Sequence, residues 1–121
     1  MAVTIGVLRE TAAGETRVAL VPEVISKYSG LGARIMIENG AGLAAQIPDQ
    51  LYADVDFSPH PQGILASCDV LLKVQPPTTE ELAALKPGAI VVGFMQAYKQ
   101  HQLVRELCER KITSFAMELV P

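Results

Sequence analysis

The sequence predicts an α/β fold in which a mainly parallel sheet is flanked by helices on both faces. Short apolar runs alternate with longer segments of helical period, and half of the 121 residues are hydrophobic (50%). The short runs are apolar at successive positions rather than at every second one, which is typical of strands that are covered on both faces. A chain of this length fits one compact domain, so we expect residues 1–121 to form a single unit.

The first third of the chain contains two predicted strands joined by a helix. Residues 3–8 (VTIGVL) form an apolar run that predicts a buried strand, and residues 34–38 (RIMIE) predict the second one. Between them, residues 22–32 have a helical pattern, with Pro22 suited to a first turn and glycines at the end.

The middle of the chain contains more turn signals than periodic segments. Residues 39–45 are glycine-rich and predict a turn, and residues 48–55 predict a short helix. The proline and glycine content of residues 56–63 predicts a loop, followed by a helical turn at 64–67. Residues 69–74 (DVLLKV) then predict a buried strand.

The last third continues the alternation of helices and strands. Residues 78–85 predict a helix that begins with a threonine N-cap and has glutamates in its first turn. Residues 89–95 (AIVVGFM) predict a buried strand, residues 101–111 a helix with an inward leucine face, and residues 112–120 a final strand.

Polar side chains follow several of these strands. Arg9 and Glu10 come directly after the first strand, Lys73 lies near the end of the strand at 69–74, and Gln96 follows the strand at 89–95. In open parallel sheets ligands bind outside the carboxyl ends of the strands. We therefore expect these four side chains along one edge of the sheet.

The composition excludes several classes of function. Net charge is −3, with lysines and arginines scattered along the chain, so there is no basic stripe of the kind that binds nucleic acid. No apolar run approaches the ~18–20 residues of a transmembrane helix, and the N-terminus lacks the features of a signal peptide. Cys68 and Cys108 have no C-x-x-C spacing, and we expect both to be reduced. The expectation is a soluble cytoplasmic domain.

One glycine motif formally suggests a nucleotide site. GAGLAA at residues 40–45 matches G-x-G-x-x-A after a strand, but Pro48 follows too soon for the long helix that would hold a pyrophosphate. We interpret it as a structural turn. The predicted fold is thus Rossmann-like or flavodoxin-like without its own dinucleotide fingerprint.

Arg17 in the first loop and Lys73 each have two possible roles. Arg17 could orient a carboxylate ligand through two parallel hydrogen bonds, or it could form a structural ion pair with Glu10 or Glu15. Lys73 could extend to the surface, or it could present its ammonium to an anionic ligand or a partner carboxylate. The two histidines, at positions 60 and 101, lack ligand partners at a suitable spacing, so no metal site is predicted.

The stretch GVLRETAAGETRVALVP resembles the opening of the family that joins alanine dehydrogenase to the alpha subunit of proton-translocating NAD(P) transhydrogenase. The family pattern is G-[IV]-x-[KR]-E followed by E-x-R-V-A-x-x-P, and the matching residues are Gly6, Arg9, Glu10, Glu15, Arg17, Val18, Ala19 and Pro22. The resemblance continues through ENGAG, LLKVQPP, LKPGAIVVGFMQ and FAMELVP. It departs from the family at YADVDFSPHPQG.

The resemblance implies that residues 1–121 are the N-terminal domain of a larger two-domain subunit. NAD would be bound by the separate Rossmann domain, which is absent from this chain, so no cofactor is expected for this chain alone. The implied partners are that NAD-binding domain, the NADP-binding and membrane subunits, and a second copy in a homodimer. The domain would be cytoplasmic, peripheral to the inner membrane through its partner subunits.

The resemblance also implies the branch of the family. In alanine dehydrogenases an arginine and a lysine matching Arg17 and Lys73 hold the substrate, and a histidine matching Gln96 is the general acid/base. An amide cannot shuttle a proton, which favours the transhydrogenase branch, with Arg9, Glu10 and Glu15 as supporting residues and no catalytic residue in this chain. The alternatives are an alanine-dehydrogenase-like domain that binds pyruvate or alanine, and a non-catalytic assembly module.

Overall fold

Six parallel strands form the centre of the computed structural model, which describes residues 2–121. The strand order is β3-β2-β1-β4-β5-β6, and every neighbouring pair is parallel. The strands are β1 (Thr4–Val7), β2 (Arg34–Glu38), β3 (Asp56–Ser58), β4 (Val70–Leu72), β5 (Ile90–Gly93) and β6 (Thr113–Ala116). This is the doubly wound order of Rossmann-type sheets, and it confirms the predicted α/β class.

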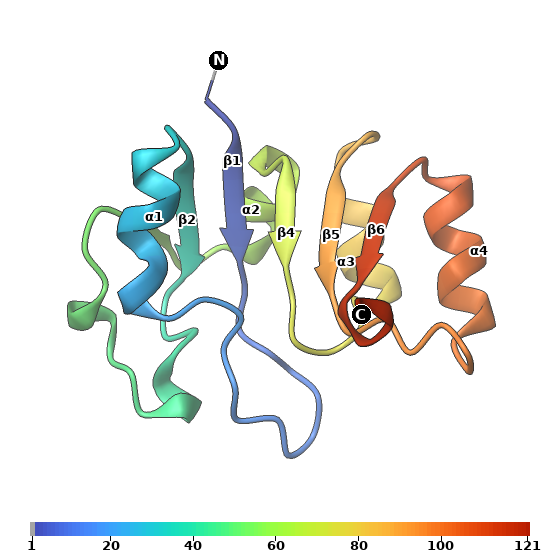
Figure 1. Ribbon diagram of the computed structural model, residues 1–121, viewed down its shortest axis with the longest axis horizontal. Coiled ribbons are helices and arrows are strands. Elements are labelled where there is room, and N and C mark those ends of the chain that lie inside the picture. Colours follow the sequence, from blue (N-terminus) through green and yellow to red (C-terminus); the bar gives the residue numbers. More distant parts are fainter. Residues whose placement is uncertain (1) are drawn as a thin grey trace.

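Helices cover both faces of the sheet, as predicted. Figure 1 shows α1 (Ile25–Gly30) beside β2, whereas α2 (Pro61–Ser67) and α3 (Thr79–Ala84) lie behind the sheet. The last helix, α4 (His101–Glu109), stands at the β6 end (Figure 1). Short 3-10 turns complete the fold: η1 (Pro22–Val24), η2 (Leu43–Ala45), η3 (Asp49–Leu51) and η4 (Met117–Leu119). No helix within residues 2–121 is long and apolar enough to cross a membrane.

The central strands contribute to two separate cores. Ile5 and Val7 of β1 belong to the core on the α1 side, where they pack with the isoleucines of β2. On the other side, Leu71 and Val91 pack with helices α2, α3 and α4. Gly6 permits the close approach of α2, because a Cβ there would lie 2.9 Å from Ile64. Burial of both faces explains why these strands are apolar throughout.

The prediction of a loop at residues 56–63 is wrong. Residues 56–58 form the edge strand β3, where Phe57 packs edge-on against Tyr52 with ring centroids 6.1 Å apart. Helix α2 begins at Pro61, because a proline in the first helical turn needs no N–H partner. The prolines therefore mark the boundaries of two elements rather than one long loop.

Two further boundaries differ from the sequence prediction. The helix expected at 48–55 is reduced to the single turn η3, because Tyr52 leaves the turn to donate a buried hydrogen bond to the Leu20 carbonyl (2.7 Å). The last strand ends at Ala116 rather than at residue 120. The turn η4 follows, and its Glu118 side chain binds backbone N–H groups after β5.

The two cysteines lie in different environments, and this gives a labelling prediction. Both are free, but Cys68 is buried at the C-terminal end of α2 whereas Cys108 is exposed on α4. Burial raises the pKa of the Cys68 thiol to about 11, so almost no thiolate is present there at pH 8. We expect a thiol reagent at pH 8 to label only Cys108 in the folded chain, with Cys68 reacting after denaturation. In a Cys108→Ser control, rapid labelling of the native chain would contradict this packing.

Candidate functional site

Glu10 and Lys73 meet at the carboxyl edge of the sheet. The Glu10 carboxylate accepts hydrogen bonds from the backbone N–H groups of Val74 (2.8 Å) and Gln75 (3.1 Å). One of its oxygens lies 3.3 Å from the Lys73 ammonium, and both side chains are only 2% exposed. Lys73 therefore pairs with a carboxylate of the same chain, which is one of the roles considered for it. Its ammonium does not extend to the surface.

Glu81 is the second carboxylate on Lys73, and sequence reasoning missed it. Its Oε2 lies 3.4 Å from the Lys73 ammonium. Its Oε1 accepts from the Thr78 N–H (2.8 Å), while the Thr78 hydroxyl accepts from the Glu81 N–H (3.1 Å). This is a capping box, and the T-x-x-E pattern of residues 78–81 was the signal for it. The start of α3 is thereby tied to the end of β4.

A glycine lets β5 approach Lys73 closely. A Cβ placed on Gly93 would lie 2.4 Å from the Lys73 carbonyl oxygen, which is far inside van der Waals contact. The backbone of Lys73 also donates to the Val92 carbonyl (2.9 Å). The position of the ammonium between its two carboxylates therefore depends on a residue without a side chain at position 93.

Arg17 forms an ion pair with Glu15, which is one of the alternatives that the sequence left open for it. Its Nε and Nη2 donate to the two Glu15 oxygens at 2.9 and 2.8 Å, and Gln75 donates to the same carboxylate (2.6 Å). Hydrogen bonds from Arg17 and Gln75 hold the pKa of Glu15 far below its usual range. Glu15 therefore stays ionised and orients both neighbouring side chains.

Arg17 and Gln96 line one cavity of about 280 Å³. Its walls come from the first loop and from the segments that follow β4, β5 and β6: Arg17, Gln75, Phe94, Gln96, Tyr98 and Glu118. The Arg17 guanidinium lies 5.9 Å from the centre of the Phe94 ring, a cation–π distance. Lys73 does not line this cavity. The predicted edge of the sheet is thus divided into two parts. One is the buried group of Lys73, Glu10 and Glu81, called the Lys73 cluster below, and the other is the open cavity lined by Arg17 and Gln96.

Arg9 lies in neither group. Its backbone N–H donates to Glu38 (2.9 Å), and the residue lines a second cavity of about 200 Å³ beside the starts of α2 and α3. Glu38, Glu80 and Glu81 also line this cavity. Within residues 2–121, no group of three His, Cys, Asp or Glu side chains is arranged to hold a metal ion.

The glycine turn at 40–45 does not fit a dinucleotide. It is followed by a three-residue 3-10 turn, and the Gly40 N–H is taken by the Asp49 carboxylate (3.0 Å). A Cβ on Gly42 would lie 2.7 Å from the Ile47 carbonyl oxygen, so this glycine serves internal packing. A pyrophosphate needs a helix N-terminus with free amides, which this turn does not provide.

The fold and this edge define a Rossmann-like α/β domain that carries a cavity lined by charged, amide and aromatic side chains rather than a nucleotide fingerprint. The model of the family described as alanine dehydrogenase/PNT, N-terminal domain, matches residues 6–121. The chain belongs to this family.

Individual relatives come from both branches of the family. A Rhodospirillum rubrum protein, named as a portion of the NAD(P) transhydrogenase alpha subunit, is 38% identical over 97% of this chain and 32% of that protein. An alanine dehydrogenase of Methanococcus maripaludis is 30% identical, over 96% of this chain and 32% of that protein. The crystal structure of a transhydrogenase from Sinorhizobium meliloti superimposes with a TM-score of 0.92 at 32% identity, over 98% of this chain and 36% of that chain. The chain spans about a third of the length of these relatives.

Proposed function

We propose that this chain acts as the N-terminal domain of an NAD(P) transhydrogenase alpha subunit. In the complete enzyme, the reaction would be hydride transfer from NADH to NADP coupled to proton translocation. The domain would form one wall of the cleft against the NAD-binding domain of the same subunit and would support homodimer formation. The NADP-binding and membrane subunits would be its further partners.

The observation that carries this proposal is the chemistry of the Arg17–Gln96 cavity. Its lining residues include no histidine, and Gln96 occupies the position at which the resemblance implies an acid/base histidine in alanine dehydrogenases. A glutamine amide neither gains nor loses a proton near neutral pH, so it cannot act as general acid or base. Hydride transfer between two nucleotides needs no such group. The higher identity to a transhydrogenase subunit (38% against 30%) supports the same branch.

The test is an assay of the complete polypeptide that contains this domain, assembled with its partner subunits. We expect NADH-dependent reduction of an NADP analogue. Absence of turnover in a properly assembled complex would refute the proposal.

A second candidate is a domain that binds a 2-oxo or amino acid such as pyruvate or alanine. It is favoured by Arg17, whose Nη1 has no hydrogen-bond partner among residues 2–121 while Nε and Nη2 are held by Glu15. Arg17 lines a cavity of suitable size for a small carboxylate. The candidate predicts pyruvate-dependent NADH oxidation by the complete polypeptide, with a sharply raised KM in Arg17→Ala.

A further inference from the structure

Side-chain carboxylates accept hydrogen bonds from backbone N–H groups just beyond the ends of four strands of the sheet. In each case the side chain comes from a different segment: Glu38 on the Arg9 N–H after β1, Asp49 on Gly40 after β2, Glu10 on Val74 and Gln75 after β4, and Glu118 on Met95 and Gln96 after β5. These amides lie where ligands bind in related sheets. Of the four carboxylates, only Glu118 lines the cavity that contains Arg17.

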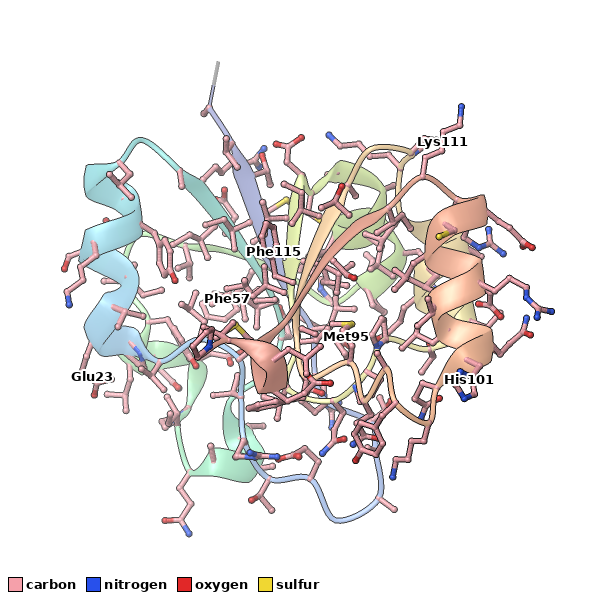
Figure 2. The ribbon with its side chains drawn as sticks, turned by 45° about the vertical axis from the view of Figure 1, so that its right-hand side comes forward. Glu23, Phe57, Met95, His101, Lys111 and Phe115 are labelled. Atoms are coloured by element: carbon pink, nitrogen blue, oxygen red, sulfur yellow. The ribbon has the colours of Figure 1, made fainter. Side chains whose placement is uncertain are left out.

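The backbone after β5 has the shape of an anion-binding nest. Gln96 has a φ of +51°, in the left-handed region that glutamine rarely adopts. A left-handed residue within a turn directs successive N–H groups toward one point, and such concave arrangements bind anions. Here the N–H groups of Met95 (3.0 Å) and Gln96 donate to separate oxygens of Glu118. In Figure 2 the η4 turn lies next to Met95, in agreement with the hydrogen bond between the two segments.

Beyond the pairing of β6 with β5 up to Ala116, the hydrogen bonds that tie the η4 turn to another segment are those of this carboxylate. Met117 and Leu119, on either side of Glu118, are 44% and 71% exposed, so apolar packing contributes little. Burial alone would raise the pKa of Glu118, but the surrounding backbone N–H groups of Glu118 itself, Met95, Gln96 and Ala97 outweigh it and lower the pKa. The side chain is therefore ionised at neutral pH, as a charge-assisted hydrogen bond requires.

We propose that Glu118 is the positioning residue of the cavity, because its carboxylate fills a carboxylate-binding nest at residues 95–97 and so fixes Gln96 on the cavity wall. The nest takes one carboxylate group, which the chain itself supplies. This inference does not depend on which nucleotide or oxo acid the complete protein uses. The test measures thermal stability and the signals of backbone amides, and not enzymatic activity. Failure of this inference is therefore distinguishable from failure of the proposed function.

The test is chemical rescue of Glu118→Ala by formate in the 121-residue chain. Loss of the carboxylate should lower Tm by roughly 5–10 °C, because charge-assisted hydrogen bonds to two amides are lost. Formate at about 0.1 M should restore roughly 3–5 °C by binding the vacated nest, whereas sodium chloride at the same concentration should not. In NMR spectra of Glu118→Ala, the amide proton signals of Met95 and Gln96 should shift when formate is added.

Glu109→Ala is the matched control, since Glu109 is an exposed carboxylate on α4 with no side-chain hydrogen bond among the described residues. It should change Tm little and show no response to formate. Equal formate effects in wild type, Glu109→Ala and Glu118→Ala would overturn the proposal, as would an unchanged Tm in Glu118→Ala.

A second variant covers the case in which Glu118→Ala does not fold. In the wild type, the Met95 and Gln96 amide signals should shift as the pH falls through a Glu118 titration that lies below the usual glutamate range. In Glu118→Gln, these two signals should lose that titration. An identical titration of both amides in Glu118→Gln would overturn the assignment.

Discussion

Replacing Lys73 by methionine is expected to lower the free energy of unfolding by about 3–5 kcal/mol, the usual cost of removing one partner from a buried ion pair. Methionine keeps most of the side-chain volume, so the loss comes from charge rather than from a cavity. Without the ammonium, the carboxylates of Glu10 and Glu81 are left near each other with no cation between them. Urea denaturation followed by circular dichroism measures the change.

The control for this prediction is an ion pair of similar type on the surface. Arg34 and Asp56 are 2.8 Å apart with side chains 57% and 58% exposed, so Arg34→Met should cost much less. Adding Glu81→Gln to Lys73→Met should recover some of the loss, since one uncompensated charge is removed. A cost for Lys73→Met no larger than that for Arg34→Met would show that the buried cluster does not stabilise the fold.

Gly93→Ala is expected to destabilise the protein by about 2–3 kcal/mol, as is common when a side chain is forced into a packed interior. The added Cβ would lie 2.4 Å from the Lys73 carbonyl oxygen and 3.0 Å from its carbonyl carbon. Both are backbone atoms of the neighbouring strand end, which cannot rotate away as a flexible side chain could. The end of β5 must therefore separate from the end of β4, and the Lys73 cluster moves with it.

Gly63→Ala provides the comparison for the same chemical change. Gly63 lies within α2, and a Cβ there would meet nothing within 4 Å. Alanine in a helix is favoured over glycine by roughly 0.5–1 kcal/mol, so this variant should be slightly more stable than the wild type. If Gly93→Ala unfolds at the same urea concentration as Gly63→Ala, the close strand contact at position 93 is not a constraint on the fold.

The sequence predicted the central strands well because strands buried on both faces are runs of successive apolar residues. The edge strand β3 has no such apolar run. Its three residues include a polar residue at each end, and it gains hydrogen bonds from β2 alone. Flanking prolines then suggested a loop, although Pro61 in fact begins α2. Short edge strands depend on their neighbours more than on their own residues.

The site was predictable where its contacts are local. Arg17 and Glu15 are two positions apart, and their pairing was one of the two readings of the first loop. Glu10 is the other carboxylate that the first loop offers to Arg17, but it pairs with Lys73, a contact between distant segments that no local pattern indicates. Glu118 was missed because it acts on backbone N–H groups, which nearly every residue has. Sequence patterns identify side-chain chemistry more readily than they identify such backbone contacts.

The cavity at the carboxyl edge presents Arg17 but no histidine, and for this reason we propose hydride transfer between nucleotides rather than amino-acid dehydrogenation. The most direct test measures two activities in one preparation of the complete polypeptide with its partner subunits. We predict NADH-dependent reduction of an NADP analogue and no NADH oxidation that depends on pyruvate and ammonium. Pyruvate-dependent oxidation with Gln96 in place, in the absence of transhydrogenation, would contradict the proposed function.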